Sequence, residues 1–209
     1  MGSLERRTRE REETRRRILD AARELFVQRG YEATSMRAIA VKIEYTPTAI
    51  YHHFKSKEAL LSELCNADSR VLAAAFRRTG RIDDPIERLH RIGEAYVGFA
   101  LENPMHYQLL FMTCRPEVME SDTALDAASQ EAYGFLLQTC AEGIAQGQFR
   151  PELDDPHEVA QILWAACHGL VSLRIAKRDQ TKMPWRDVRR TSTHLREAVL
   201  RGLLRDSPA

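Results

Sequence analysis

Apolar residues recur three and four positions apart along most of the chain, which is the spacing of one face of an α-helix. The first strong helical segment runs from about residue 14 to 28 and ends before Gly30, and short segments follow at about 36–43 and 47–53. A longer segment covers about 57–78, where we expect the inward-facing side chains to be Leu61, Leu64, Val71, Leu72 and Phe76.

The same periodicity continues to the carboxy terminus. Helices are predicted at about 85–103, 105–112, 122–146, 156–177 and 185–204, with loops at 113–120, 147–151 and 178–184. No segment shows the alternation and the enrichment in Val, Ile and Thr that are typical of strands. The pattern therefore predicts an all-α protein of about nine helices, with three short or medium helices first and longer ones after them.

Residues 35–54, SMRAIAVKIEYTPTAIYHHF, form two short amphipathic segments joined by a turn of three or four residues. Thr46 is a good N-cap and Pro47 a good first helical residue for the second segment. This is the pattern of a helix-turn-helix, in which the second helix enters the major groove and presents its first residues to the bases. Two short helices of an ordinary helical bundle would give a similar pattern, so that alternative stays open on periodicity alone.

If the segment is a helix-turn-helix, its outward side chains divide by chemistry. Threonine hydroxyls, methyl groups and histidine suit base edges, while tyrosine, lysine and helix amino termini suit phosphates. The candidate DNA-contacting residues are Thr34, Ser35, Arg37, Thr46, Pro47, Thr48, Ala49, Tyr51, His52, His53, Lys55 and Lys57.

Charge agrees with this interpretation without proving it. The whole chain carries a net charge of only +1, but residues 1–57 hold thirteen Lys and Arg against eight Asp and Glu, a net charge of +5. A basic amino-terminal quarter is expected of a module that touches DNA. Because acidic and basic residues are interleaved there, a solvated charged helix explains the same numbers.

The motifs resemble those of a known family. ILDAARELFVQRGYEATSMRAIA and TAIYHHFKSKEALLSEL, from Ile18 to Leu64, are similar to the DNA-binding domain of the tetracycline-repressor (TetR) family. One departure lies in the turn, where Glu44 stands in place of the glycine that the family usually has. A non-glycine residue at positive φ is uncommon and costs conformational energy.

The carboxy-terminal part resembles the TetR subclass named for a Trp-His-Gly motif, here Trp164, His168 and Gly169. The resemblance implies a DNA-binding domain at 12–72, preceded by a charged arm at 1–11, and a domain for ligand binding and dimerisation at 73–209. It also implies a homodimer built from the helices at about 156–177 and 185–204, and hence a palindromic DNA operator.

The resemblance further implies a repressor that a small hydrophobic ligand releases from the operator, by favouring a second state of the dimer. Ligand sites are mostly apolar with a few converging polar groups. Ordinary core packing explains the same aromatic residues in the middle helices. The candidate ligand-binding residues are Tyr96, Phe99, Tyr107, Phe111, Tyr133, Trp164 and His168.

Other classes of protein fit less well. The chain has no metal-ligand spacing, phosphate-binding loop or G-x-S-x-G motif, so neither an enzyme nor a metal or other cofactor is expected. The four cysteines lie far apart, which favours reduced thiols in a cytoplasmic protein. We expect no signal peptide and no transmembrane helix. A DNA-binding regulator that needs no ligand, or one that activates transcription, remains the alternative.

Overall fold

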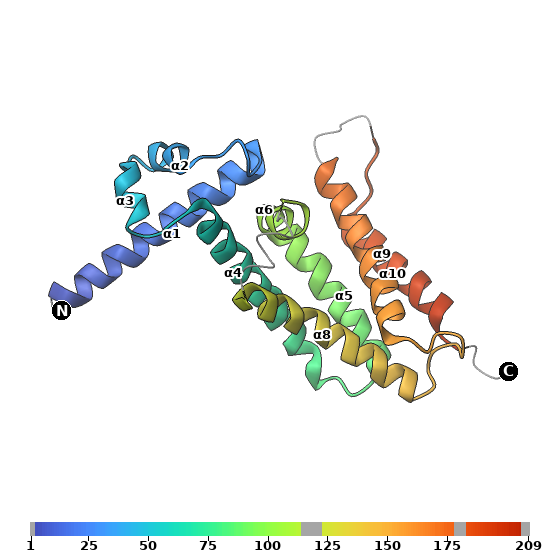
Figure 1. Cartoon of the computed structure of the whole chain (residues 1–209). Helices are drawn as coiled ribbons and strands as arrows, with labels where there is room; N and C mark the ends of the chain where they lie inside the picture. The colour runs from blue at the N-terminus through green and yellow to red at the C-terminus, as the bar shows by residue number, and fades with distance from the viewer. Residues whose placement is uncertain (1–2, 114–122, 178–182, 206–209) are drawn as a thin grey trace. The chain divides into compact units, whose positions relative to one another are not determined.

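The computed structural model describes residues 3–113, 123–177 and 183–205, and these residues form helices connected by short loops (Figure 1). The chain divides into two compact units, one of Met1–Asp68 with Met105–Asp126 and one of Ser69–Pro104 with Ala127–Ala209. Within the described residues the only pairing of extended backbone is an isolated bridge between Phe149 and Leu204. The prediction of an all-α fold is therefore confirmed.

The first unit begins with α1 (Ser3–Arg29), followed by the two short helices α2 (Met36–Lys42) and α3 (Pro47–Tyr51) and by α4 (Lys57–Arg77), which continues into the second unit. Gly30 ends α1 with a φ of 83°, a conformation that costs glycine little. The oxygens of Ser35 and Thr46 accept hydrogen bonds from the amides of Ala38 and Ala49, as helix N-caps do. Two of the predicted helix starts are thus set by side-chain caps.

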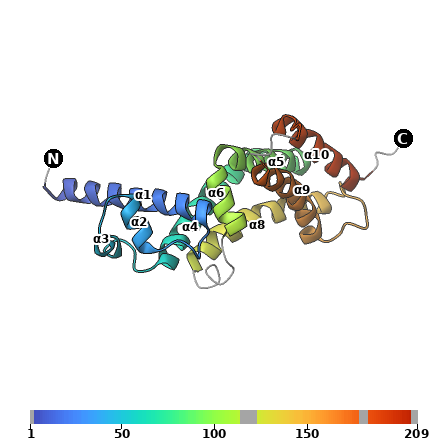
Figure 2. The same cartoon turned by 90° about the horizontal axis from the view of Figure 1, so that it is seen from above.

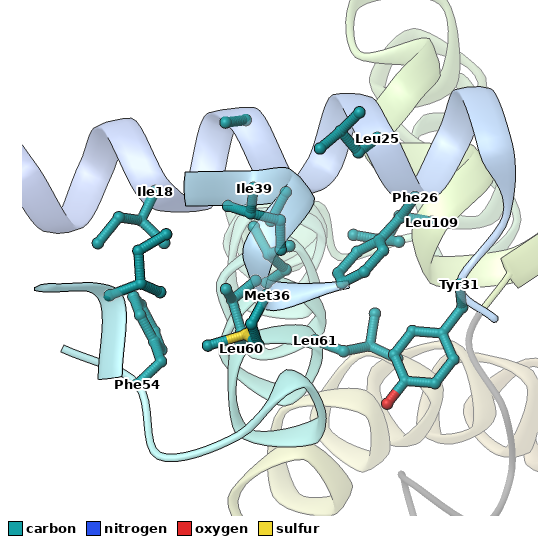
Figure 3. Packing of buried hydrophobic residues seen from close by; sticks show 14 of the residues in the cluster. Ile18, Leu25, Phe26, Tyr31, Met36, Ile39, Phe54, Leu60, Leu61 and Leu109 are labelled. Carbon is teal, nitrogen blue, oxygen red and sulfur yellow. The ribbon is translucent and has the colours of Figure 1, made fainter. Parts of the chain in front are cut away.

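The core of the first unit brings α1, α2, α3 and α4 together around large apolar side chains (Figure 3). Ile18, Ile39, Ile50 and Leu60 are each fully buried. Leu109 also belongs to this core, although it is more than forty residues further along the chain. It lies at the start of η2 (Leu109–Thr113), which directly follows α6 (Pro104–Gln108).

A buried ion pair lies beside this core. The carboxylate of Asp68, on α4, accepts a hydrogen bond from Arg23 of α1 through one oxygen and lies 2.8 Å from His106 Nδ1 of α6 through the other. Asp68 is 1% exposed and Arg23 is 7% exposed. Buried charges are costly unless they are paired, and here three helices contribute to the pairing.

The second unit contains the end of α4, η1 (Arg78–Arg81), α5 (Pro85–Glu102), most of α8 (Thr123–Ala145), α9 (Pro156–Ala176) and α10 (Val188–Leu203). α5 and α9 begin in the same way, with an aspartate N-cap, Asp84 or Asp155, followed by proline. α9 packs against both α5 and α10. Its inner residues Val159, Ala160 and Val171 are fully buried.

Two expectations about the elements need correction. Val71 is 54% exposed on α4, although its spacing predicted an inward side chain. α10 begins at Val188 rather than near Trp185, because the side chain of Asp187 accepts a hydrogen bond from the amide of Arg190 and caps the helix there. The predicted loops at 113–120 and 178–184 fall largely outside the described residues.

The expectation about the cysteines holds only in part. Cys140 and Cys167 are free and buried, and burial raises the pKa of Cys140 to about 12. Cys65 is instead disulfide-bonded, so the prediction of a reduced thiol is wrong there. Cys114 lies outside the described residues. The cysteines therefore give no argument about the compartment in which the protein works.

Candidate DNA-binding surface and aromatic cluster

The turn between α2 and α3 has the geometry that a helix-turn-helix needs. Glu44 adopts a φ of 62°, so it takes the left-handed conformation at the position where the sequence lacks the usual glycine. The amide of Glu44 donates to Val41 O at 3.1 Å, and the amide of Tyr45 donates to Ala40 O at 2.9 Å. The replacement by glutamate is thus accommodated without loss of the turn.

The outward side of the helix-turn-helix is polar and accessible. Tyr51 is 53% exposed at the end of α3, while Ile50 on the opposite side is fully buried and holds the helix on the core. Ala49 and His53 are half-buried. The remaining exposed candidates are Ser35, Arg37, Thr46, Pro47, Thr48, His52 and Lys55.

Two candidates are occupied inside the protein. Thr34 is 1% exposed, and its hydroxyl lies 2.8 Å from Gly30 O and 3.2 Å from Leu25 O, so its side chain is not placed to touch DNA. Lys57 donates to Tyr31 O at 2.9 Å, and its ammonium lies 4.0 Å from the centroid of the Tyr31 ring. Through these contacts, both side chains stabilise the loop between α1 and α2.

Arg15 of α1 holds the end of α3, a role that sequence reasoning missed. Its guanidinium donates to the carboxylate of Glu63 and to His53 O, at 2.8 Å for the latter, and lies 4.1 Å from the Phe54 ring centroid. The pKa of His53 is lowered by burial first and then by the charges of Arg11, Arg15 and His52. His53 is therefore neutral at pH 7 in the absence of DNA.

An aromatic cluster in the second unit contains four of the predicted ligand-binding residues. The indole N–H of Trp164 donates to the hydroxyl of Tyr96 at 3.1 Å, and that hydroxyl lies 3.1 Å from His168 Nδ1. Burial lowers the pKa of His168, so its ring is neutral and offers one donor and one acceptor. Trp164 is 39% exposed, a large fraction for an indole held by a hydrogen bond.

The cluster continues from Trp164 to α8. The ring centroids of Tyr133 and Trp164 lie 6.2 Å apart, and the Tyr133 hydroxyl lies 3.1 Å from His157 Nδ1. The structure thus adds His157, which is not among the residues that the sequence analysis selected.

The other three predicted ligand-binding residues are not part of this cluster. Tyr107 is fully buried, and its ring lies 4.9 Å from that of Phe111, which packs on the core of the first unit. Phe99 is 5% exposed on α5, in the second unit. Tyr107 and Phe99 have the burial expected of ordinary core residues, and Phe111 is partly buried. No group of three or more metal-ligating side chains occurs among the described residues.

Comparison with known proteins places this geometry in a family. Residues 18–64 match the model of bacterial regulatory proteins of the tetR family, and residues 89–199 match that of a tetracyclin repressor-like C-terminal domain. The chain belongs to the TetR family. The predicted helix-turn-helix and the prediction of a transcriptional regulator rather than an enzyme are thereby confirmed. The Trp-His-Gly subclass is not confirmed by these matches and stays a prediction.

Individual relatives support the assignment. The transcriptional regulator UidR of Escherichia coli is 42% identical over 81 residues, a region that spans 39% of this chain and 38% of UidR. The transcriptional repressor KstR2 of Mycobacterium tuberculosis is 30% identical over 149 residues, which cover 66% of this chain and 70% of KstR2.

Solved structures agree on the fold. The TetR family transcriptional regulator PfmR of Thermus thermophilus is 28% identical, with a TM-score of 0.70 over 90% of this chain and 99% of PfmR. The structure of KstR2, described as a ketosteroid transcriptional regulator, has a TM-score of 0.72 at 22% identity and covers 92% of this chain and 96% of KstR2. At that identity the likeness to KstR2 shows the fold alone.

Proposed function

We propose that this protein is a repressor that binds a palindromic DNA operator as a homodimer and leaves it when a small hydrophobic ligand binds. Membership of the TetR family and the exposed polar residues of α3 support the DNA-binding part of this proposal. In this proposal the division into a DNA-binding domain at 12–72 and a ligand-binding domain at 73–209 is functional, and the protein works on DNA in the cytoplasm.

For DNA, Pro47, Thr48 and Ala49 open α3 and would face the bases, while Tyr51 and Lys55 would hold phosphates. Selection of bound fragments from random duplexes by the purified protein would identify the operator. Thr48→Ala should change which sequences are selected, whereas Lys55→Gln should weaken binding to all of them and reduce its salt dependence. If the unaltered protein selects no sequence, the proposal fails.

For dimerisation, α9 has a second apolar face. It is long and apolar enough, by length and composition, to cross a membrane, yet only 28% of its most apolar window is buried. At 100° per residue, Ala165, Gly169, Leu173 and Ala176 share the side opposite the buried Val171. Leu173 is 50% exposed there. A helix that is apolar on two sides is normally buried on both, and small residues let a second backbone approach.

A second copy of this chain covers that face in our proposal, with α10 completing a four-helix interface. Leu173→Glu should weaken the dimer at least about a hundredfold, since each dimer would bury two unpaired carboxylates. Gln138→Glu, on the exposed side of α8, adds the same charge elsewhere and should leave the dimer intact. Sedimentation equilibrium measures both, and a Leu173→Glu dimer of unchanged affinity would rule out this face.

For the ligand, the cluster of Tyr96, Tyr133, Trp164 and His168 offers aromatic surface with few polar groups. KstR2 is a ketosteroid transcriptional regulator, which supports an apolar ligand with a hydrogen-bonding end. Fatty acids and ketosteroids are therefore the probes for a thermal-shift screen, since a ligand of the native state raises the melting temperature. Trp164→Ala should remove the shift, and Trp185→Ala, the other tryptophan, should keep it.

Two alternatives remain distinguishable by direct measurement. A regulator that needs no ligand would show no thermal shift and no loss of operator affinity with any probe. An activator would raise transcription from a promoter beside its operator in a purified system, whereas a repressor would lower it.

A further inference from the structure

α1 is much longer than its contact with the core requires. Ile18 is the first fully buried residue of this 27-residue helix, and Arg15, one turn before it, contacts Glu63 of the same unit. The residues before Thr14 are exposed wherever their exposure is described. At a rise of 1.5 Å per residue this exposed part is about 17 Å long, and Figures 1 and 2 both show it projecting beyond α3.

On one side of this arm the charged residues are arginines. Arg7, Arg11 and Arg15 follow one another at intervals of four, so they lie along one side of the helix. Arg15 contacts His53 and Phe54 at the end of α3, which shows that this side faces the recognition helix. The influence of the Arg11 charge on the lowered pKa of His53 agrees with that direction.

The charges on this side are not neutralised within the protein. Arg7 and Arg11 are exposed, and among the described residues neither side chain makes a hydrogen bond or an ion pair. Arg11 has no carboxylate three or four residues away in either direction. By contrast, Arg6 pairs with Glu10 at 3.6 Å. Like charges at intervals of four destabilise a helix, so an anionic partner is the natural one for this side.

We propose that Arg7 and Arg11 form a second DNA-contacting element, which binds the sugar-phosphate backbone of the duplex outside the bases that α3 reads. The inference rests on the proposed DNA binding, because Arg15 on this side of α1 contacts His53 O, directly after the candidate DNA contact His52. When α3 lies in the major groove, phosphates flank it on both sides. The arm then extends each half-site outward without reading its sequence.

The test uses the full chain with Arg7 and Arg11 both changed to Gln, which keeps the helix propensity. The matched control changes Arg6 and Arg9 to Gln, so it removes the same charge from other sides of the arm. Two duplexes are compared, one ending at the outer edge of each selected half-site and one extended by about 10 bp, one helical turn, at each end.

On the extended duplex the Arg7/Arg11 variant should bind about 10–100-fold more weakly than the unaltered protein. The slope of log K against log salt should fall by about 3–4, because a dimer loses four phosphate contacts at about 0.9 each. The unaltered protein should lose the same affinity when the flanks are removed, whereas the variant should not respond to the flanks. The control should keep the flank dependence.

Three results would overturn the inference. The variant could keep the flank dependence and the salt slope of the unaltered protein. The control could lose as much as the variant, which would mean that only net charge matters. Full operator affinity of the variant, with loss of dimerisation or of binding to another protein, would assign the arm to a protein partner. Failure of the unaltered protein to bind any duplex is a separate outcome, which removes the proposed function itself.

Discussion

At the scale of single residues, Glu44 carries a conformational cost that the rest of the turn outweighs. A left-handed conformation costs a residue with a Cβ atom about 1–2 kcal/mol, while glycine loses about 0.5–1 kcal/mol more entropy on folding. Glu44→Gly should therefore raise the free energy of unfolding by up to about 1 kcal/mol, measured by urea denaturation. Glu44→Ala keeps the positive φ and should gain little. A loss of stability in the glycine variant would contradict the positive φ of 62° at this position.

A second residue-scale prediction concerns His168. Burial lowers its pKa, so the unfolded chain binds a proton more readily than the folded protein does. Its contribution to stability is full above the unfolded value of about 6.5 and is lost as the pH falls below it. The melting temperature of His168→Gln should thus fall less between pH 7.5 and pH 5.5 than that of the unaltered protein. The pKa of His53 is also lowered, but His53 is present in both proteins, so its effect on the comparison cancels. An equal fall in melting temperature for the two proteins would contradict the prediction.

At the scale of helices, Asp68 joins α1, α4 and α6 through Arg23 and His106. Asp68→Asn leaves the guanidinium of Arg23 buried without a countercharge and should lower the free energy of unfolding by about 3–5 kcal/mol. The exposed pair of Arg77 and Glu131 provides the comparison, since Arg77→Gln should cost about 0–1 kcal/mol. Denaturant titration measures the loss of unfolding free energy in each variant. Equal losses would show that the ion pair of Asp68 does not hold the three helices together.

The helices also show how far the sequence alone could lead. The caps Ser35 and Thr46 and the apolar spacing of Ile39 and Ile50 are local signals, so the helix-turn-helix was predictable. The sequence could not assign Tyr107 to one of the two units. The apolar pattern of a five-residue helix does not show which core the helix packs against. Val71 has an apolar side chain at an inward spacing and is nevertheless exposed, since tertiary packing rather than periodicity decides burial. The aromatic cluster was found by residue type, but its partner His157 depended on how α8 and α9 pack.

At the scale of the whole molecule, stability should depend on protein concentration. If the outer face of α9 is buried only between two copies, dilution shifts the chain toward a less stable monomer, and the melting temperature rises with concentration. Differential scanning calorimetry over a hundredfold range of concentration measures this directly. Leu173→Glu should melt at a lower temperature that no longer changes with concentration, whereas Gln138→Glu should follow the unaltered protein. A concentration-independent transition in all three proteins, with operator binding intact, would mean that DNA rather than the α9 face brings two copies together.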